Sequence, residues 1–359
     1  MEKLKYTRVE ECCEILDSMR IPITASDRKE GKYPYYGANG IQDYVNDYIF
    51  DDELVLLAED GGNFGSKEKP IAYRVSGKCW VNNHAHVLKP KEEIDVDYLC
   101  YSLMFYKVDG MINGATRKKL TQTAMKKMKI PLRNIVEQKK IVQQLNKIIE
   151  IREKAKKELN LLDNLIQARF VEMFGDPITN SKLLPIEKIE ERYFLKAGIT
   201  TKAEDIHDYL KDKYEIPCYG GNGIRGYVEN LSYEGCYPII GRQGALCGNV
   251  QYATGKFHAT EHAVLVSTLK NDNTMWVYYM LKLMDLYRYH TGAAQPGLAV
   301  KKLNTIDVIV ADINLQNQFA AFVHQINKSK FVERFLELSL FYGLSSPLNS
   351  EMICIFPYF

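Results

Sequence analysis

The chain contains one long internal repeat, and this repeat limits the folds that it can adopt. Pro34–Ile41 matches residues 217–224 at an offset of 183 positions, and Asn83–Ala85 matches residues 261–263 at an offset of 178. Three further pairs keep the second offset: Gly114 with Gly292, Leu120 with Leu298 and Gln138 with Gln316. A period of about 180 residues far exceeds the roughly 20–50 residues of solenoid repeats. We therefore expect two similar domains that carry two similar sites.

Short β-type stretches, separated by Gly- and Asn-rich turns, occupy the first part of each repeat. Helical patches accompany them at 97–106 and 274–286. This mixture predicts a compact α/β domain in each repeat, over residues 1–133 and 177–312.

A glycine-free stretch from Glu137 to Phe174 follows the first domain. Its apolar residues alternate at spacings of four and three, broken only by Arg152 and Arg169: Ile141, Leu145, Ile148, Ala155, Leu159, Leu162, Ile166 and Met173. This spacing is typical of a coiled-coil seam, which needs a partner helix. Gly175-Asp176-Pro177 supplies a stop signal. We predict a long helix over 134–176, and the alternative is a helix packed on its own domain.

The second repeat starts the same helix near Asn314 but breaks its seam. The interrupting residues are charged or disfavour helix: Lys330, Glu333, Gly343, Ser345, Ser346 and Pro347. We predict a shortened helix over 313–342 and an atypical tail over 343–359. A partner this short would leave three seam residues uncovered and available to another chain, namely Leu159, Leu162 and Ile166. The predicted class is α+β: two similar α/β domains, each followed by a long helix, with the helices pairing as an antiparallel coiled coil.

Two segments resemble catalytic or cofactor motifs. His258–His262 fits the HxxEH zinc-protease pattern, but its flanking sequence predicts a strand where the motif needs a helix. Residues 221–226 fit GxGxxG, but an extended segment follows, and the first repeat has Ala38 and Asp43 where glycines should be. No other catalytic arrangement is present in the sequence, so we expect no catalytic residues and no metal site. An enzyme with unrecognised motifs is the alternative.

Composition adds few constraints. The chain has no run of 18 apolar residues and no apolar core of a signal peptide near Met1, which predicts a cytoplasmic protein. Its eight cysteines form no CxxC pair and are expected to be reduced. With a net charge of +2, any nucleic-acid surface must be local.

Polar, glycine-rich loops recur in both repeats and could read DNA, although each loop alone could be an ordinary turn. Glycines allow close backbone approach, and Asn, Gln and Arg side chains pair with base edges. Residues 107–140 also hold ten Lys or Arg against two acids, whereas 285–318 hold three basic residues against three aspartates. The DNA-contact candidates are Tyr36, Asn39, Asn63, Asn83, Arg117, Lys118, Lys126, Lys127, Asn222, Arg225, Arg242, Gln243 and Gln295.

Five segments together resemble the specificity (S) subunits of type I restriction-modification systems: Tyr33–Ile41, Trp80–His86, Leu132–Ile141, Gly241–Ala245 and Thr291–Pro296. The resemblance implies two target-recognition domains, each reading half of a bipartite asymmetric DNA site. The helices would set the spacing of the half-sites and dock DNA methyltransferase subunits, which restriction subunits then join. S-adenosylmethionine, ATP and Mg would be bound by those partners, and the S subunit itself would perform no chemistry.

Two departures from the family pattern bear on this resemblance. Gly114–Lys118 lacks the Gln-Pro of Gln295-Pro296, and the second helix is altered. The alternatives are a coiled-coil scaffold that does not read DNA, or an inactive or recombined specificity cassette that does not assemble a working complex.

Overall fold

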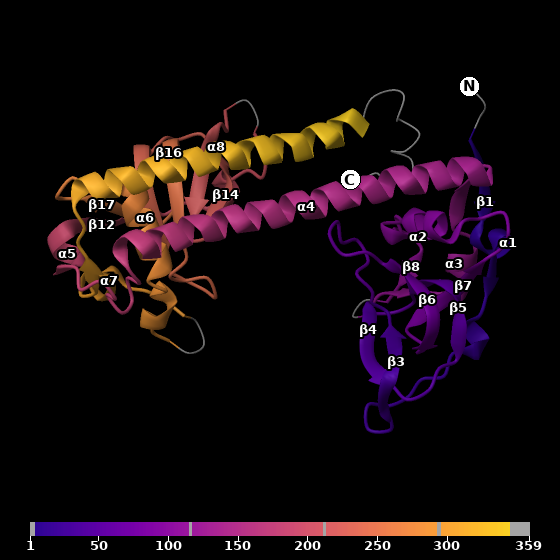
Figure 1. Ribbon diagram of the computed structural model, residues 1–359. Helices are drawn as coiled ribbons and strands as arrows, with labels where there is room; N and C mark the ends of the chain where they lie inside the picture. The colour runs from indigo at the N-terminus through magenta and orange to yellow at the C-terminus, as the bar shows by residue number, and fades with distance from the viewer. Residues whose placement is uncertain (1–3, 115–116, 211–212, 293–295, 345–359) are drawn as a thin grey trace. The chain divides into compact units, whose positions relative to one another are not determined.

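The protein, seen here in a computed structural model, consists of two compact units (Figure 1). The structure describes residues 4–114, 117–210, 213–292 and 296–344. One unit comprises Met1–Ala155 and Phe335–Phe359, and the other comprises Lys156–Arg334. Each unit contains a mixed α/β domain and helical segments, as the internal repeat predicts.

The first unit is built on a six-stranded sheet of order β2-β7-β5-β6-β3-β4. Its strands are β2 (Cys13–Ile15), β3 (Glu30–Gly37), β4 (Gly40–Val45), β5 (Phe50–Ala58), β6 (Ala72–Val81) and β7 (Ala85–Pro90). All neighbours are antiparallel except β3 and β6. Around the sheet lie β1 (Lys5–Arg8), α1 (Val9–Cys12), η1 (Asp17–Met19), α2 (Val96–Met104), β8 (Ile112–Asn113), β9 (Lys119–Leu120), α3 (Gln122–Lys126) and β10 (Lys129–Leu132).

The second unit repeats this sheet in the order β12-β17-β15-β16-β13-β14. Its strands are β12 (Tyr193–Ala197), β13 (Ile216–Gly220), β14 (Gly223–Val228), β15 (Tyr233–Gly241), β16 (Val250–Ala259) and β17 (Ala263–Thr268). The smaller elements are β11 (Ile186–Lys188), α5 (Ile189–Arg192), η2 (Ala203–Asp205), α6 (Thr274–Leu283), η3 (Leu286–Tyr289), α7 (Val300–Asn304) and β18 (Asp307–Ile309). The repeat extends to the register, because Ala58 pairs with Ala85 just as Gly241 pairs with Ala263.

The central strands are buried on both faces. In β5, Val55 and Leu57 belong to the core that contains α2, whereas Leu54 and Leu56 face a second apolar cluster. This explains why β5 reads as a continuous apolar run rather than as an alternating strand. Because both faces of the central strands are covered, the exposed polar part of each domain lies at the strand ends and in their loops.

The long helix α4 (Ile135–Phe174) has 40 residues and is about 60 Å long. Near its start, Val142 and Leu145 pack into the core of the first domain. Near its end, Ile166, Phe170 and Phe174 pack into the core of the second. The domains therefore cover parts of the predicted seam. Helix α4 thus packs on its domains, as the alternative expected, and also pairs with a second helix.

Helix α4 ends at Phe174, directly before the stop signal at Gly175 and two residues before the predicted end at 176. Gly175 follows it with φ +80°, a left-handed conformation that glycine adopts without strain, and its N–H donates to Val171 O at 2.8 Å.

In the second unit, α8 (Ile313–Leu344) runs antiparallel to the end of α4. The ring of Phe319 contacts Phe170 and Phe174, at centroid distances of 5.3 and 5.8 Å. Further along α8, Lys330 forms an ion pair with Asp163. The order of these contacts runs in opposite directions along the two helices, which confirms antiparallel pairing.

Two details of the second helix differ from the sequence prediction. Ile166, predicted to be uncovered, is fully buried, because the core of the second domain and α8 cover it. Leu159 and Leu162 are half-buried. Helix α8 also continues through Gly343 to Leu344, two residues beyond the predicted end at 342. The tail from 345 lies outside the described residues.

One buried glutamine joins each long helix to its domain. The Oε1 atom of Gln138 accepts from the N–H of Asp95 at 2.8 Å, and that of Gln316 accepts from Asn273 at the same distance. Asp95 and Asn273 are the N-caps of α2 and α6. Each amide group also donates twice: Gln138 to Glu93 O and Arg133 O, and Gln316 to Asp272 Oδ1 and Ala311 O. Both side chains are fully buried, so all their polar atoms depend on these contacts.

We predict that Gln138→Ala lowers the free energy of unfolding by about 1–3 kcal/mol, because it leaves a buried N–H and two carbonyls without partners. Urea unfolding followed by circular dichroism measures this. Gln144→Ala, an exposed position on the same helix, is the matched control and should change stability by less than about 0.5 kcal/mol. Equal effects of the two substitutions would contradict the proposed joint.

Candidate nucleic-acid interface

In each domain three segments meet beyond the end of a central strand, β5 or β15: the residues that follow this strand, the turn between the next two strands, and a segment that precedes a short helix. In the first domain, Glu59 N donates to His84 O, Leu120 N to Glu59 O, and Gly61 N to Lys118 O, at 2.8, 2.7 and 3.2 Å. In the second domain, the corresponding bonds are Arg242 N to His262 O, Leu298 N to Arg242 O, and Gly244 N to Pro296 O, at 3.0, 2.8 and 2.9 Å. The two domains thus share one backbone framework at this place.

Glycine is needed where the β13–β14 turn meets the strand end. A Cβ on Gly241 would lie 2.1 Å from the carbonyl oxygen of Gly221, which no side chain tolerates. This close backbone packing belongs to the second domain, because Ala58 holds the same register position in the first. This packing holds the side chains of the turn beside those that follow the strand.

The first domain carries an ion-paired arginine at this framework. Asp60 Oδ1 lies 2.8 Å from Arg117 Nη2 and 2.6 Å from His84 Nδ1. Asn39 donates to Gly61 O at 3.0 Å and so ties the β3–β4 turn to the same segment. The guanidinium of Arg117 remains more than half exposed, so it can still contact a ligand in the solvent.

The second domain carries a groove of about 460 Å³ at the same place. Its lining residues are Gly220, Gly221, Asn222, Gly223, Ile224, Arg225, Gln243, Ala245, Leu246 and His262. Three buried polar atoms near this framework have no hydrogen-bond partner among the described residues: Arg242 Nε, Thr260 Oγ1 and His262 Nδ1. An open groove with unsatisfied polar atoms can accept a polar ligand.

The predicted contact residues fall into several places. Exposed residues are Asn39, Asn83, Arg117, Lys118, Lys127, Asn222, Arg225 and Gln243, and partly buried ones are Tyr36, Asn63, Lys126 and Arg242. Gln295 lies outside the described residues. The groove unites Asn222, Arg225 and Gln243, whereas Lys126 and Lys127 belong to a different element, the end of α3.

Asn63 and Tyr36, like Asn39 and Arg117, have contacts within their own domain. Asn63 donates to Pro70 O at 3.3 Å within its own loop. The ring of Tyr36 packs against Tyr73, and burial raises the pKa of the Tyr36 hydroxyl. Sequence reasoning missed His262 as a lining residue, although its match with His84 in the repeat was a usable signal.

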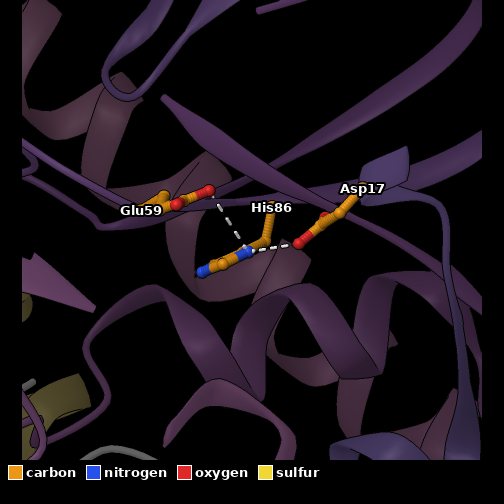
Figure 2. A group of neighbouring side chains, drawn as sticks. All are labelled: Asp17, Glu59 and His86. Carbon is orange, nitrogen blue, oxygen red and sulfur yellow. Dashed lines mark hydrogen bonds and ion pairs between the residues drawn. The ribbon is translucent and has the colours of Figure 1, made fainter. Parts of the chain in front are cut away.

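A buried ionic network adjoins the framework of the first domain, with which it shares Glu59 (Figure 2). His86 Nδ1 is 2.7 Å from Asp17 Oδ2 and 3.7 Å from Glu59 Oε2. Arg20 Nη1 lies 2.6 Å from Glu59 Oε2, and Lys119 Nζ lies 3.0 Å from Glu59 Oε1. The sequence offers no signal for this cluster, because its members are far apart in the chain and share no motif.

Opposing effects act on the pKa values of the two acids. Burial raises the pKa of Asp17, but the hydrogen bond and charge of His86 outweigh it, so this pKa lies below its usual value. Burial likewise raises the pKa of Glu59, and the contacts with Arg20 and Lys119 lower it further than burial raises it. Both side chains are therefore carboxylates at neutral pH.

The two motif-like segments have structural roles. His258 lies on β16 and its ring contacts Thr201 and Ser232, while Glu261 and His262 follow in a turn, so the helical zinc-protease geometry is not formed. Residues 221–226 form the β13–β14 hairpin rather than the strand-to-helix turn of a nucleotide fold. Within the described residues, no helix has the length and apolar character to cross a membrane.

Comparison with known proteins gives consistent matches. The family model for the type I restriction modification DNA specificity domain matches residues 1–161 and 195–333. The Escherichia coli type I restriction enzyme EcoprrI specificity subunit is 46% identical over 133 residues, which are 37% of this chain and 33% of that protein. A putative type I restriction enzyme specificity subunit of Haemophilus influenzae is 35% identical over 144 residues, 40% of this chain and 37% of that protein. Each match thus spans about a third of the relative's length.

Solved structures extend the match in fold to nearly the whole chain. The type I restriction-modification S subunit from M. genitalium superposes with a TM-score of 0.63 at 16% identity, over 97% of this chain and 96% of that one. A chain from a study of assembly and conformational transition of the type I R-M system gives 0.52 at 13% identity, over all of both chains. Together with the family model, which covers both repeats, these findings show that the chain belongs to the type I restriction-modification DNA specificity family.

Proposed function

We propose that this chain is a DNA specificity subunit in which each domain reads one half of a bipartite, asymmetric DNA site. One observation carries the proposal: the same backbone framework presents different side chains in the two domains. Glu59 and Asp60 in the first domain occupy the positions of Arg242 and Gln243 in the second. Two similar scaffolds with different reading groups support recognition of two different half-sites.

The chemistry of these groups suits DNA bases. Arginine pairs with the O6 and N7 acceptors of guanine, glutamine and asparagine with adenine, and carboxylates with the amino group of cytosine. Arg117 and Asp60 offer a cation and an acceptor in the first domain, whereas the groove of the second offers Arg225 and Gln243. Lys126 and Lys127 would bind the phosphate backbone, because that contact needs only positive charge.

The long helices would set the distance between the half-sites and dock DNA methyltransferase subunits, with restriction subunits joining the complex. Catalysis would belong to these partners, together with S-adenosylmethionine, ATP and Mg. The buried glutamine joints support the spacing role, since a helix can space two domains only if each is held firmly to it.

The proposal is tested by selection from a pool of randomised DNA duplexes with the full chain and its methyltransferase subunit. We expect a bipartite site with two unlike halves. Exchanging residues 180–312 for the equivalent part of a related specificity subunit should change one half only, which assigns each half to its domain. Selection of a single undivided site, or a change in both halves, would contradict modular reading.

Arg242→Ala should weaken recognition by the second domain. Arg242 shares a backbone segment with Gln243, and losing a good base contact costs about 1–3 kcal/mol of discrimination. Binding to the selected site and to single-base variants at matched salt measures the loss. An unchanged preference for every base of the second half-site would remove Arg242 from the contacts.

The double substitution of Lys126 and Lys127 by alanine should weaken binding to all duplexes alike. Each lost phosphate contact reduces the slope of log affinity against log salt by about 0.9. Lys202→Ala, a largely exposed lysine outside the predicted basic patch, is the control. Equal slopes for the wild type and the double variant would show that these lysines do not contact phosphate.

Seven residues inserted into α4 after Ala155 should lengthen the spacer between half-sites by about three base pairs, at 1.5 Å per helical residue and 3.4 Å per base pair. One heptad nearly preserves the faces that pack on each domain, because it turns the helix by only about 20° less than two full turns. Methylation mapping in cells reports the new spacing. An unchanged spacer would show that α4 is not the ruler.

A further inference from the structure

The geometry of the ionic network in the first domain places a hydrogen on one ring nitrogen of His86. His86 Nε2 lies 2.9 Å from the carbonyl oxygen of Leu120, and a carbonyl can only accept, so Nε2 carries a hydrogen. Nδ1 faces the carboxylate of Asp17 at 2.7 Å, which also accepts. Both ring nitrogens of His86 therefore face hydrogen-bond acceptors, and the ring is fully buried between two acids.

These charges leave little reason for a metal ion, although Asp17, Glu59 and His86 could offer three ligand atoms within 4.8 Å of one another. Arg20 and Lys119 already pair with the carboxylate of Glu59, and Arg20 and His86 lie against that of Asp17. Asp17 is further satisfied by the amide of Gln122 at 2.9 Å and the N–H of Val87 at 2.9 Å. A divalent cation would have to break the contact between His86 Nδ1 and Asp17 and lie beside a guanidinium.

The network contacts the segment that carries two of the predicted basic DNA-contact residues, Arg117 and Lys118. His86 holds the carbonyl of Leu120, Glu59 holds the ammonium of Lys119, and Asp17 holds the amide of Gln122. Arg117 and Lys118 precede these three residues directly. With the Asp60–Arg117 ion pair, polar contacts hold this segment at four of the six positions 117–122.

The second domain has no such network at the same backbone positions. By strand register, Val264 stands where the first domain has His86. Asp17 lies two residues after Ile15 at the end of β2, and Ala197 lies two residues after Leu195, the register match of Ile15. Arg242 stands in place of Glu59, and Gly297 in place of Lys119. The backbone bonds of the framework persist without the charges, so the fold itself does not require the network.

We propose that Asp17, Glu59 and His86 are positioning residues for DNA reading by the first domain, acting by holding segment 117–120 against the end of β5. This inference rests on the proposed function. It adds that the two domains use different means, an ionic network in one and backbone bonds alone in the other, to order the same reading segment.

The test uses the full chain with its methyltransferase subunit and the double variant Asp17→Ala/His86→Val, which installs the residues of the second domain. Removing both partners of a buried pair avoids an unpaired charge, so the variant should fold. Discrimination against single-base changes in the first half-site should fall about tenfold, while discrimination in the second half-site stays within about twofold. His86→Val alone removes one partner of the buried Asp17 carboxylate, which keeps Arg20, Gln122 and Val87, and should unfold at lower denaturant.

Asp272→Asn is the matched control, because Asp272 is as buried as Asp17 and pairs with Arg192 in the second domain, where it also contacts Gln316 beside the helix joint. It should lower stability without changing base preference in either half.

A double variant that folds and discriminates like the wild type would reduce the network to a stabilising role and overturn the inference. Stoichiometric Zn²⁺ binding in calorimetry, lost in the double variant, would overturn it in favour of a metal site. A wild-type chain that selects no bipartite site would instead overturn the proposed function, and this inference with it.

Discussion

The structure depends on two buried glutamines: Gln138 joins α4 to the first domain, and Gln316 joins α8 to the second. A single side chain here links the N-cap of a domain helix to the start of a long helix, and in each case Oε1 and Nε2 are both satisfied. These buried amides fix the rotation of each long helix on its domain. A rotated helix would leave several polar groups unpaired, at a cost of about 1–3 kcal/mol each. The joint therefore fixes direction as well as attachment, which apolar packing alone does less precisely.

The two domains of the repeat share their backbone structure and differ in their side chains. The shared part is backbone: strand order, register, glutamine joint and the three hydrogen bonds of the framework. The differing part is side chain, with Glu59 and Asp60 exchanged for Arg242 and Gln243. In the first domain the cations lie on segment 117–119 and the acids follow β5. In the second, the cation follows β15, and Pro296 and Gly297 are uncharged. The first domain thus places opposite charges against each other across the framework, whereas the second places a cation against uncharged residues.

The sequence predicts the two domains, the long helix and its end at Gly175 because these depend on local or periodic signals. It fails for Ile166, whose cover comes from residues more than 100 positions away in α6 and α8. It also interprets Lys330 only as a break in the seam, whereas the structure pairs it with Asp163. The network of Asp17, Glu59 and His86 has no period or motif, so only the folded sheet brings it together. Of the residues that line the groove, the sequence predicts Asn222, Arg225 and Gln243 as candidate DNA contacts, but not His262.

The two domains also differ in how much of their polar chemistry is already satisfied. In the first, the acids and cations around His86 pair with one another, so segment 117–120 is held before any ligand arrives. In the second, Arg242 Nε, Thr260 Oγ1 and His262 Nδ1 have no partner among the described residues. Unsatisfied buried groups raise the free energy of the unliganded domain, and a ligand that pairs with them removes that penalty. The first domain thus gains from preorganisation, and the second from contacts that it leaves open.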